Sequence, residues 1–165
     1  MKIAINAGTL YPARRAWIYG SEVEAFLLAE ELGKLGHTIY FYGAPGSEKS
    51  PYFNKFRYLP GGHGLIDISK EHFIVEYYAD ELLDVDVIID MSPQLYTAEW
   101  AFFNNVPFIA VRNGMDITLP RLFRYRNLVV LSNVVVDHNK IPYTSVKIIP
   151  YGIDEDFYKI GRAHV

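Results

Sequence analysis

The fold is decided by residues 21–42, SEVEAFLLAEELGKLGHTIYFY, and by the short run KIAIN at residues 2–6. Apolar side chains in the longer stretch repeat at helical spacing, at Ala25, Leu28, Leu32 and Leu35. Ser21 and Glu24 form a capping box at the start of this expected helix, and Gly36 is placed to end it in the left-handed conformation. The apolar residues that close the stretch are expected to form a second strand. A strand, a helix and a strand in this order form a βαβ unit, which predicts parallel strands joined by a right-handed crossover.

The same alternation of strands and helices continues through the rest of the chain. Further buried strands are expected at Val85–Asp90, Pro107–Val111, Leu128–Leu131 and Val146–Ile149. Helices are expected at about residues 69–83 and 119–125. Two more are expected, one that begins with Ser92 as N-cap and Pro93 and ends near Asn104-Asn105, and a short one after Ser132 as N-cap. Residues 43–64 carry most of the turn formers, which predicts a long surface loop. Six strands alternating with helices predict a doubly wound, mainly parallel α/β sheet with helices on both faces.

Length and composition are those of one globular domain, with 165 residues, half of them hydrophobic and 21% charged. The net charge of −3 gives no reason to expect a nucleic-acid partner. The chain has no cysteine, which excludes disulfides, thiolate metal sites and a cysteine nucleophile. The histidines show no His-x-x-x-His or comparable spacing, so no metal site is expected.

Ligands of open α/β sheets bind at the carboxyl ends of the strands. This rule selects residues 7–21, 90–93, 112–116 and 151–154. The first segment lacks the G-x-G-x-x-G fingerprint of dinucleotide binding. Gly20 and Ser21 instead lie at a helix amino terminus, where free N–H groups and the helix dipole favour an anion or sugar hydroxyls. The alternative, given equal weight, is that these two residues only turn the chain and cap the helix.

Charged residues near these segments are further candidates for ligand contacts. Four arginines cluster in the sequence, at Arg112, Arg121, Arg124 and Arg126, and guanidinium groups match phosphate oxygens. The commoner alternative is that such arginines are solvated or paired on a helix face. Asp90 and Asp116 could form a carboxylate pair, but a turn or capping role is the more frequent one for each.

Three parts of this sequence resemble the motifs of one known enzyme family. Residues 19–22 (YGSE) and 35–39 (LGHTI) resemble the family's G-G-x-E…L…G-H-x-V opening. Residues 106–114 (VPFIAVRNG) resemble its P-x-V-x-T-x-H-G strand. Residues 129–132 (VVLS) and 148–157 (IIPYGIDEDF) resemble its V-S…V-I-P-N-G-[IV]-D…F exit. The chain therefore resembles the amino-terminal, Rossmann-like domain of a GT-B glycosyltransferase, and most closely the family 4 glycosyltransferases.

The resemblance implies transfer of a sugar from a nucleotide-sugar donor to the hydroxyl of a sugar or lipid-linked acceptor. It also implies that the configuration at the transferred sugar is retained and that neither a metal nor another cofactor is needed. A location in the cytoplasm or at the membrane surface is expected with it. This domain would form the acceptor side of the cleft, with substrate-binding residues at Gly20, Ser21, Asp90, Arg112, Asn113 and Gly114. Asn113 falls where many members have a histidine; because an amide does not titrate, we expect it to bind a sugar hydroxyl but to have no acid–base role. Tyr19 replaces the first glycine of the family's pair.

The resemblance also implies a domain boundary. Residues 1–159 would form the amino-terminal domain, and Pro150, Gly152 and Asp154 the hinge toward a donor-binding carboxyl-terminal domain that this chain lacks. Residues 160–165 (IGRAHV) resemble translated sequencing-adapter DNA, so a non-native tail is expected there. On this hypothesis the chain alone is inactive. Two alternatives stay open: a stand-alone α/β module that binds a sugar or nucleotide without catalysis, and a nucleotide-dependent oxidoreductase or epimerase, against which the missing glycine fingerprint counts.

Overall fold

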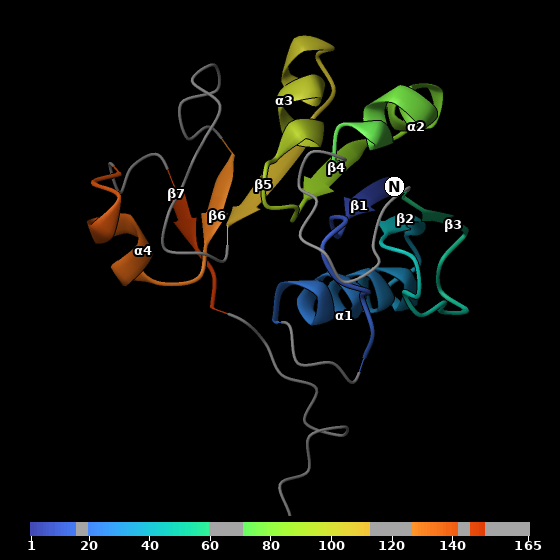
Figure 1. Ribbon diagram of the computed structural model, residues 1–165, viewed down its shortest axis with the longest axis horizontal. Helices are drawn as coiled ribbons and strands as arrows, with labels where there is room; N and C mark the ends of the chain where they lie inside the picture. Colours follow the sequence, from blue (N-terminus) through green and yellow to red (C-terminus); the bar gives the residue numbers. More distant parts are fainter. Residues whose placement is uncertain (16–19, 60–70, 113–126, 142–145, 151–165) are drawn as a thin grey trace, which may run out of the picture.

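The computed structural model describes residues 1–15, 20–59, 71–112, 127–141 and 146–150. Within these ranges a single sheet contains the strands β1 (Lys2–Asn6), β2 (Thr38–Gly43), β3 (Lys55–Tyr58), β4 (Val87–Asp90), β5 (Phe108–Arg112), β6 (Leu128–Val130) and β7 (Val146–Ile148). All strand pairs are parallel, in the order β3-β2-β1-β4-β5-β6-β7 (Figure 1). The order reverses between β1 and β4, which is the topological switch point of a Rossmann-like sheet. The predicted doubly wound parallel α/β fold is confirmed.

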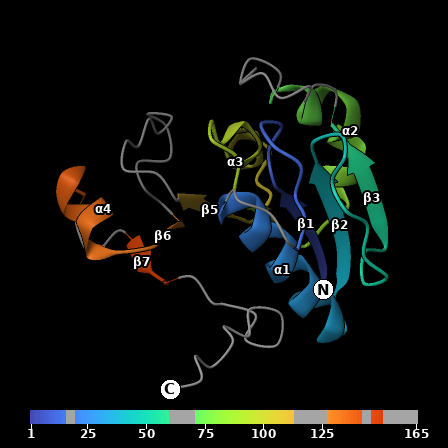
Figure 2. The ribbon, with the colours of Figure 1, turned by 60° about the horizontal axis from the view of Figure 1, so that its bottom comes forward.

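The described helices cover the two faces of the sheet unequally. They are α1 (Gly20–Lys34), α2 (Phe73–Leu83), α3 (Tyr96–Phe103) and α4 (Asn133–His138). α1 packs on one face, where Phe26 contacts the layer that contains Ile5 and Phe41. α2, α3 and α4 pack on the other face, over a layer that contains Ile88 and Leu128 (Figure 2). The helix predicted at residues 119–125 lies outside the described residues.

The segment predicted as a long surface loop contains a strand. β3 pairs in parallel with β2, from Tyr40 opposite Lys55 to Gly43 opposite Tyr58, so that part of the prediction for residues 43–64 is wrong. Charged and aromatic residues alternate along KFRY, and the strand lies at the sheet edge where none of its residues is fully buried. A short edge strand of this composition lacks the apolar run that identifies a central strand.

The start of α1 differs from the capping-box prediction. The helix begins at Gly20, so Ser21 is its second residue, and the Ser21 Oγ donates to Glu22 Oε2 at 2.8 Å. The buried stripe of the helix consists mainly of Val23, Ala25, Phe26 and Ala29. Leu35, which the predicted stripe included, is 74% exposed beyond the end of the helix. Gly36 has a φ of +88°, as predicted for a residue that ends a helix.

α3 begins later than predicted. The sequence predicts Ser92 as N-cap and Pro93 as first helical residue, whereas the helix begins at Tyr96 after Leu95 in the left-handed conformation, with φ 56°. Ser92 does not cap the helix because its Oγ donates to Asp90 Oδ1 at 2.7 Å and accepts from the Leu95 N–H at 3.2 Å. These two bonds fold residues 92–95 into a turn between β4 and α3.

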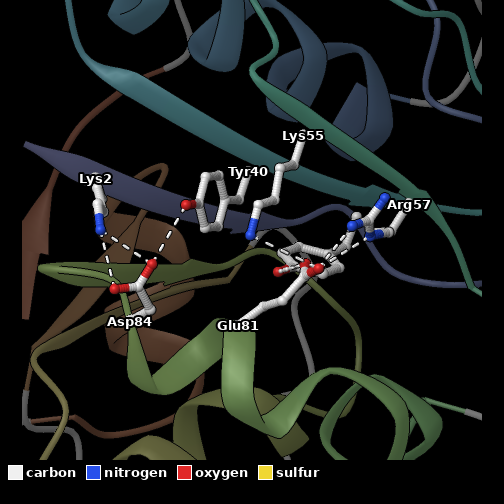
Figure 3. A network of polar contacts seen from close by, with 7 residues as sticks. Lys2, Tyr40, Lys55, Arg57, Glu81 and Asp84 are labelled. Atoms are coloured by element: carbon white, nitrogen blue, oxygen red, sulfur yellow. Dashed lines mark hydrogen bonds and ion pairs between the residues drawn. The ribbon is translucent and has the colours of Figure 1, made fainter.

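A network of polar contacts fixes α2 against the strands β1–β3 (Figure 3). Lys2 Nζ donates to Asp84 Oδ1, at the end of α2, at 2.9 Å. Inside α2, Glu81 accepts from the Tyr42 hydroxyl at 3.1 Å and from Arg57 Nη2 at 2.6 Å. Burial raises the pKa of the Tyr42 phenol, and the Glu81 carboxylate raises it further. The network fixes the position of α2 on the sheet. It therefore also helps to fix the position of residues 71–72, which directly precede the helix.

Candidate functional site

The switch point carries a buried polar pair. Asn6 and Asp90 lie opposite each other at the carboxyl ends of β1 and β4, and both are buried. Asn6 Nδ2 donates to Asp90 Oδ1 at 3.2 Å and to Thr97 Oγ1, on α3, at 2.8 Å. Asn6 Oδ1 accepts from the Gly8 N–H at 2.9 Å, which turns the chain away from β1. The pair therefore joins β1, β4 and α3 at the edge where ligands of such sheets bind.

Asp90 organises the turn that follows β4. Its Oδ1 accepts from the Ser92 N–H at 3.0 Å and from the Ser92 hydroxyl, and its Oδ2 accepts from the Ala98 N–H at 2.8 Å. Burial raises the pKa of the Asp90 carboxyl, while these hydrogen bonds oppose the rise. The carboxylate is buried and accepts hydrogen bonds from several protein donors. Its role in the site is therefore to hold the turn after β4 in place. Its predicted contact with substrate stays a prediction, and its proposed partner Asp116 lies outside the described residues.

The turn at residues 92–95 is held from three other elements. Glu71 Oε2, just before α2, accepts from the Gln94 N–H at 2.8 Å. Arg112, at the end of β5, donates through Nη1 to the Pro93 carbonyl. After β1, Gly8 packs so closely that an added Cβ would lie 3.2 Å from the Pro93 Cδ. These contacts bring together β1, β4, β5 and α2, which are distant in sequence, around one turn.

Glu71 is the functional candidate that the sequence did not identify. It is 1% exposed, and its Oε1 has no hydrogen-bond partner within the part of the chain that the structure describes. Burial raises the pKa of the Glu71 carboxyl to about 7; Asp90 raises it as well, whereas Arg112 lowers it. A carboxyl with this pKa exchanges a proton near neutral pH. No signal in the sequence identified it, because it lies inside a predicted helix, where a charged residue is normally solvated.

Arg112 joins this cluster, as its predicted position at a strand end suggested. It is half-buried, and burial lowers the pKa of its guanidinium while Glu71 and Asp90 raise it. The buried Thr9 hydroxyl, after β1, has no hydrogen-bond partner among the described residues. The cluster itself offers a cation and a carboxyl with a raised pKa. Such groups can recognise phosphate oxygens or sugar hydroxyls.

The other predicted site residues are placed as follows. Gly20 and Ser21 begin α1 at the same edge of the sheet; Gly20 is exposed, while the Ser21 hydroxyl is engaged with Glu22. Pro150 is exposed after β7. The remaining predicted residues lie outside the described ranges: Asn113, Gly114, Gly152, Asp154, Arg121, Arg124 and Arg126.

Among the described residues, no group of three or more His, Cys, Asp or Glu side chains could hold a metal ion. None of the helices in those ranges is both long enough and apolar enough to cross a membrane.

Replacing Gly8 by alanine should destabilise the protein more than the same change at Gly36. Both glycines have positive φ, +84° and +88°, so each alanine costs about 1–2 kcal/mol in the left-handed conformation. The Cβ at Gly36 would meet nothing within 4 Å, whereas the Cβ at Gly8 would press on Pro93. Urea unfolding should give a further loss of about 1 kcal/mol for Gly8→Ala. Equal losses in the two variants would show that the contact with the turn is unimportant.

Comparison with known proteins shows that a solved structure has a fold similar to that of this chain. No protein-family model matches this sequence, and no curated protein is significantly similar to it. Among solved structures, the crystal structure of a glycosyltransferase from Rickettsia africae ESF-5 is similar, with a TM-score of 0.59 and 17% sequence identity. The match covers 94% of this chain and 44% of that protein, so the chain spans less than half of its structural neighbour. At this identity the similarity establishes the fold, and the predicted assignment to family 4 stays a prediction.

Proposed function

We propose that this chain is the acceptor-side half of a retaining GT-B glycosyltransferase of family 4. In this proposal the whole enzyme moves a sugar from a nucleotide-sugar donor to the hydroxyl of a sugar or lipid-linked acceptor. The observation that carries it is the polar cluster of Glu71, Asp90 and Arg112 at the switch point of a fold shared with a glycosyltransferase. Glycosyl transfer requires recognition of hydroxyls and anionic oxygens at one place, and this cluster supplies groups of both kinds.

The chemistry expected of this half is binding and orientation. The free N–H groups at the start of α1, beside Gly20 and Ser21, favour an anionic oxygen because the helix dipole is positive there. Arg112, at the carboxyl end of β5, adds a cation at the same edge of the sheet. Asn113 and Gly114 would follow it toward the acceptor, with the Asn113 amide bonding to a hydroxyl without exchanging a proton. Electrostatic stabilisation of the departing nucleotide would need further groups from the other half.

The proposed division between two halves is supported by relative length. The structural neighbour is more than twice as long as the part that this chain matches. We therefore assign donor binding to a carboxyl-terminal domain that would follow Pro150, Gly152 and Asp154, with residues 160–165 as a non-native tail. A cytoplasmic location is included in the proposal, since a chain without cysteine suits a reducing compartment.

This chain alone should bind nucleotide sugars only weakly. Titration calorimetry with UDP-glucose and with GDP-mannose is expected to give dissociation constants above about 1 mM, or less than about 4 kcal/mol of binding free energy. The physical reason is that the donor-binding groups belong to the missing half. Micromolar binding of either compound by this chain would contradict the acceptor-side assignment and favour a stand-alone binding module.

The source DNA provides the complementary test. Extending the open reading frame past Lys159 should reveal a second βαβ array with a carboxylate donor motif. The longer protein should then release nucleotide from a sugar donor when an acceptor is present, whereas this chain should not. A stop codon directly after Lys159 would overturn the two-domain proposal.

A further inference from the structure

α3 carries its large side chains on the side that faces away from the sheet. Its buried residues are small: Thr97, Ala98 and Ala101. At the outward positions, Tyr96 and Phe103 are exposed and Trp100 is half-buried. These three aromatic residues follow one another at helical spacing and form one stripe. A surface helix normally has charged and polar residues on this side, whereas a helix that is apolar all round is normally covered on both sides.

α2 lies beside α3 on the same face of the sheet and extends this surface (Figure 1). Its outward residues include Tyr77 and Leu83, which are 65% and 54% exposed. The His72 ring, directly before α2, lies 6.3 Å from the Tyr96 ring in an edge-to-face arrangement and joins the two helices. We call the outward apolar residues of both helices the aromatic face: Tyr77, Leu83, Tyr96, Trp100 and Phe103. Single exposed apolar residues are ordinary, but a group of them on neighbouring helices indicates contact with another molecule.

The charge around the aromatic face is negative. Neither helix contains a lysine or an arginine, while Glu76 and Asp80 are exposed on α2 and Glu99 is half-buried on α3. Anionic lipid surfaces and nucleic acids carry the same sign of charge and are repelled. A symmetric contact between two copies of this chain would bring the same carboxylates against each other. The charge therefore favours a partner with basic residues.

The size of the aromatic face suits a single helix. The 11 residues of α2 span about 16 Å, and two helices packed side by side are roughly 20 Å across. A stable interface between whole subunits buries about 800 Å² on each partner, which is more than a face of these dimensions supplies. An amphipathic helix that lies along two neighbouring helices buries one apolar stripe and needs no larger surface.

We propose that the aromatic face binds an amphipathic helix of another protein, with apolar residues against the face and lysines or arginines toward Glu76 and Asp80. Aromatic side chains contribute much of the binding free energy in such contacts because each buries a large apolar area. The basic residues of the partner accelerate association and fix the orientation of its helix. The face lies on the outer side of α2 and α3, so the proposal does not depend on the proposed glycosyl transfer.

Titration of the full chain with a designed helix tests this proposal. The probe is a fluorescently labelled peptide of leucine and lysine, about 18 residues or five helical turns long, with the leucines on one side. Its charge-reversed control has glutamate in place of lysine. Fluorescence anisotropy should give a dissociation constant of about 10–100 μM for the lysine peptide and at least about tenfold weaker binding for the glutamate peptide.

Two double variants locate the binding on the aromatic face. Tyr77→Ser with Phe103→Ser should weaken binding of the lysine peptide about tenfold or more, because both aromatic anchors are lost. Leu35→Ser with Val134→Ser is the matched control, since it removes two exposed apolar side chains from outside α2 and α3 and should leave the affinity unchanged. Circular dichroism of each variant confirms that the chain is folded.

Four results would overturn the proposal. Absence of saturable binding of the lysine peptide would show that the face does not accept such a helix. Equal affinity in the two double variants would show attraction by net charge alone. A parent dimer in sedimentation that Tyr77→Ser with Phe103→Ser abolishes would identify a second copy as the partner. Binding of the parent, but not of that variant, to phosphatidylserine vesicles would identify a lipid surface.

Discussion

Asp90→Ala is expected to reduce the free energy of unfolding by about 3–5 kcal/mol. The carboxylate is completely buried and accepts from Asn6, from the Ser92 N–H and hydroxyl, and from the Ala98 N–H. Removing it leaves several buried donors without an acceptor, and each such donor costs about 1–3 kcal/mol before relaxation. Urea unfolding followed by circular dichroism measures the loss.

Asp86→Ala is the matched control for this prediction. Asp86 lies just before the same strand and accepts from the Lys2 N–H at 2.7 Å, but it is exposed. Water can replace the lost carboxylate there, so a loss of about 0.5 kcal/mol or less is expected. If Asp90→Ala cost no more than the control, Asp90 would not hold the turn in the way described.

The fold could be predicted because it depends on local patterns that repeat along the chain. The βαβ unit at residues 2–42 sets two parallel strands, and the same alternation recurs with short connections. The sequence does not reveal β3, because an edge strand of charged and aromatic residues lacks the apolar run that marks a buried strand. The start of α3 was misplaced for a different reason: Ser92 bonds to Asp90, and this competes with the capping role.

The candidate site was predicted only in part, because its geometry comes from contacts across the fold. The rule of strand carboxyl ends located Asp90 and Arg112, and the structure brings both to the turn at residues 92–95. Glu71 depends on Gln94, on Asp90 and on Arg112 for its position and its pKa. Such long-range contacts leave no periodic signal in the sequence. A charged residue within an expected amphipathic helix is normally solvated, so its burial could not be inferred.

The turn at residues 92–95 is held by both Asp90 and Glu71. Asp90 holds it from the end of β4 by hydrogen bonds from several donors, and burial raises the pKa of its carboxyl. Glu71, just before α2, holds it with a carboxyl whose charge changes near neutral pH. The effect of a substitution that removes the Glu71 charge should therefore grow with pH.

Glu71→Gln is expected to stabilise the protein above pH 7 and to have little effect near pH 5. The pKa of Glu71 is about 7 in the folded protein against an ordinary value of 4.5, so the native state binds more protons than the unfolded state between these pH values. Stability of the parent therefore falls as pH rises through this window, and the loss is complete above pH 7. The difference of about 2.5 pKa units corresponds to about 3 kcal/mol. Glutamine has nearly the same shape and avoids the buried charge.

The measurement is urea unfolding of the parent and of Glu71→Gln at several pH values from 5 to 8.5. The free-energy difference between them should increase by about 3 kcal/mol across this range, and the glutamine can still accept from the Gln94 N–H. Glu31→Gln, at a carboxylate on α1 whose side chain is 64% exposed, should follow the parent at every pH. A constant difference between the parent and Glu71→Gln at all pH values would refute the raised pKa and would assign the difference to packing, because only a titrating group makes the difference grow with pH.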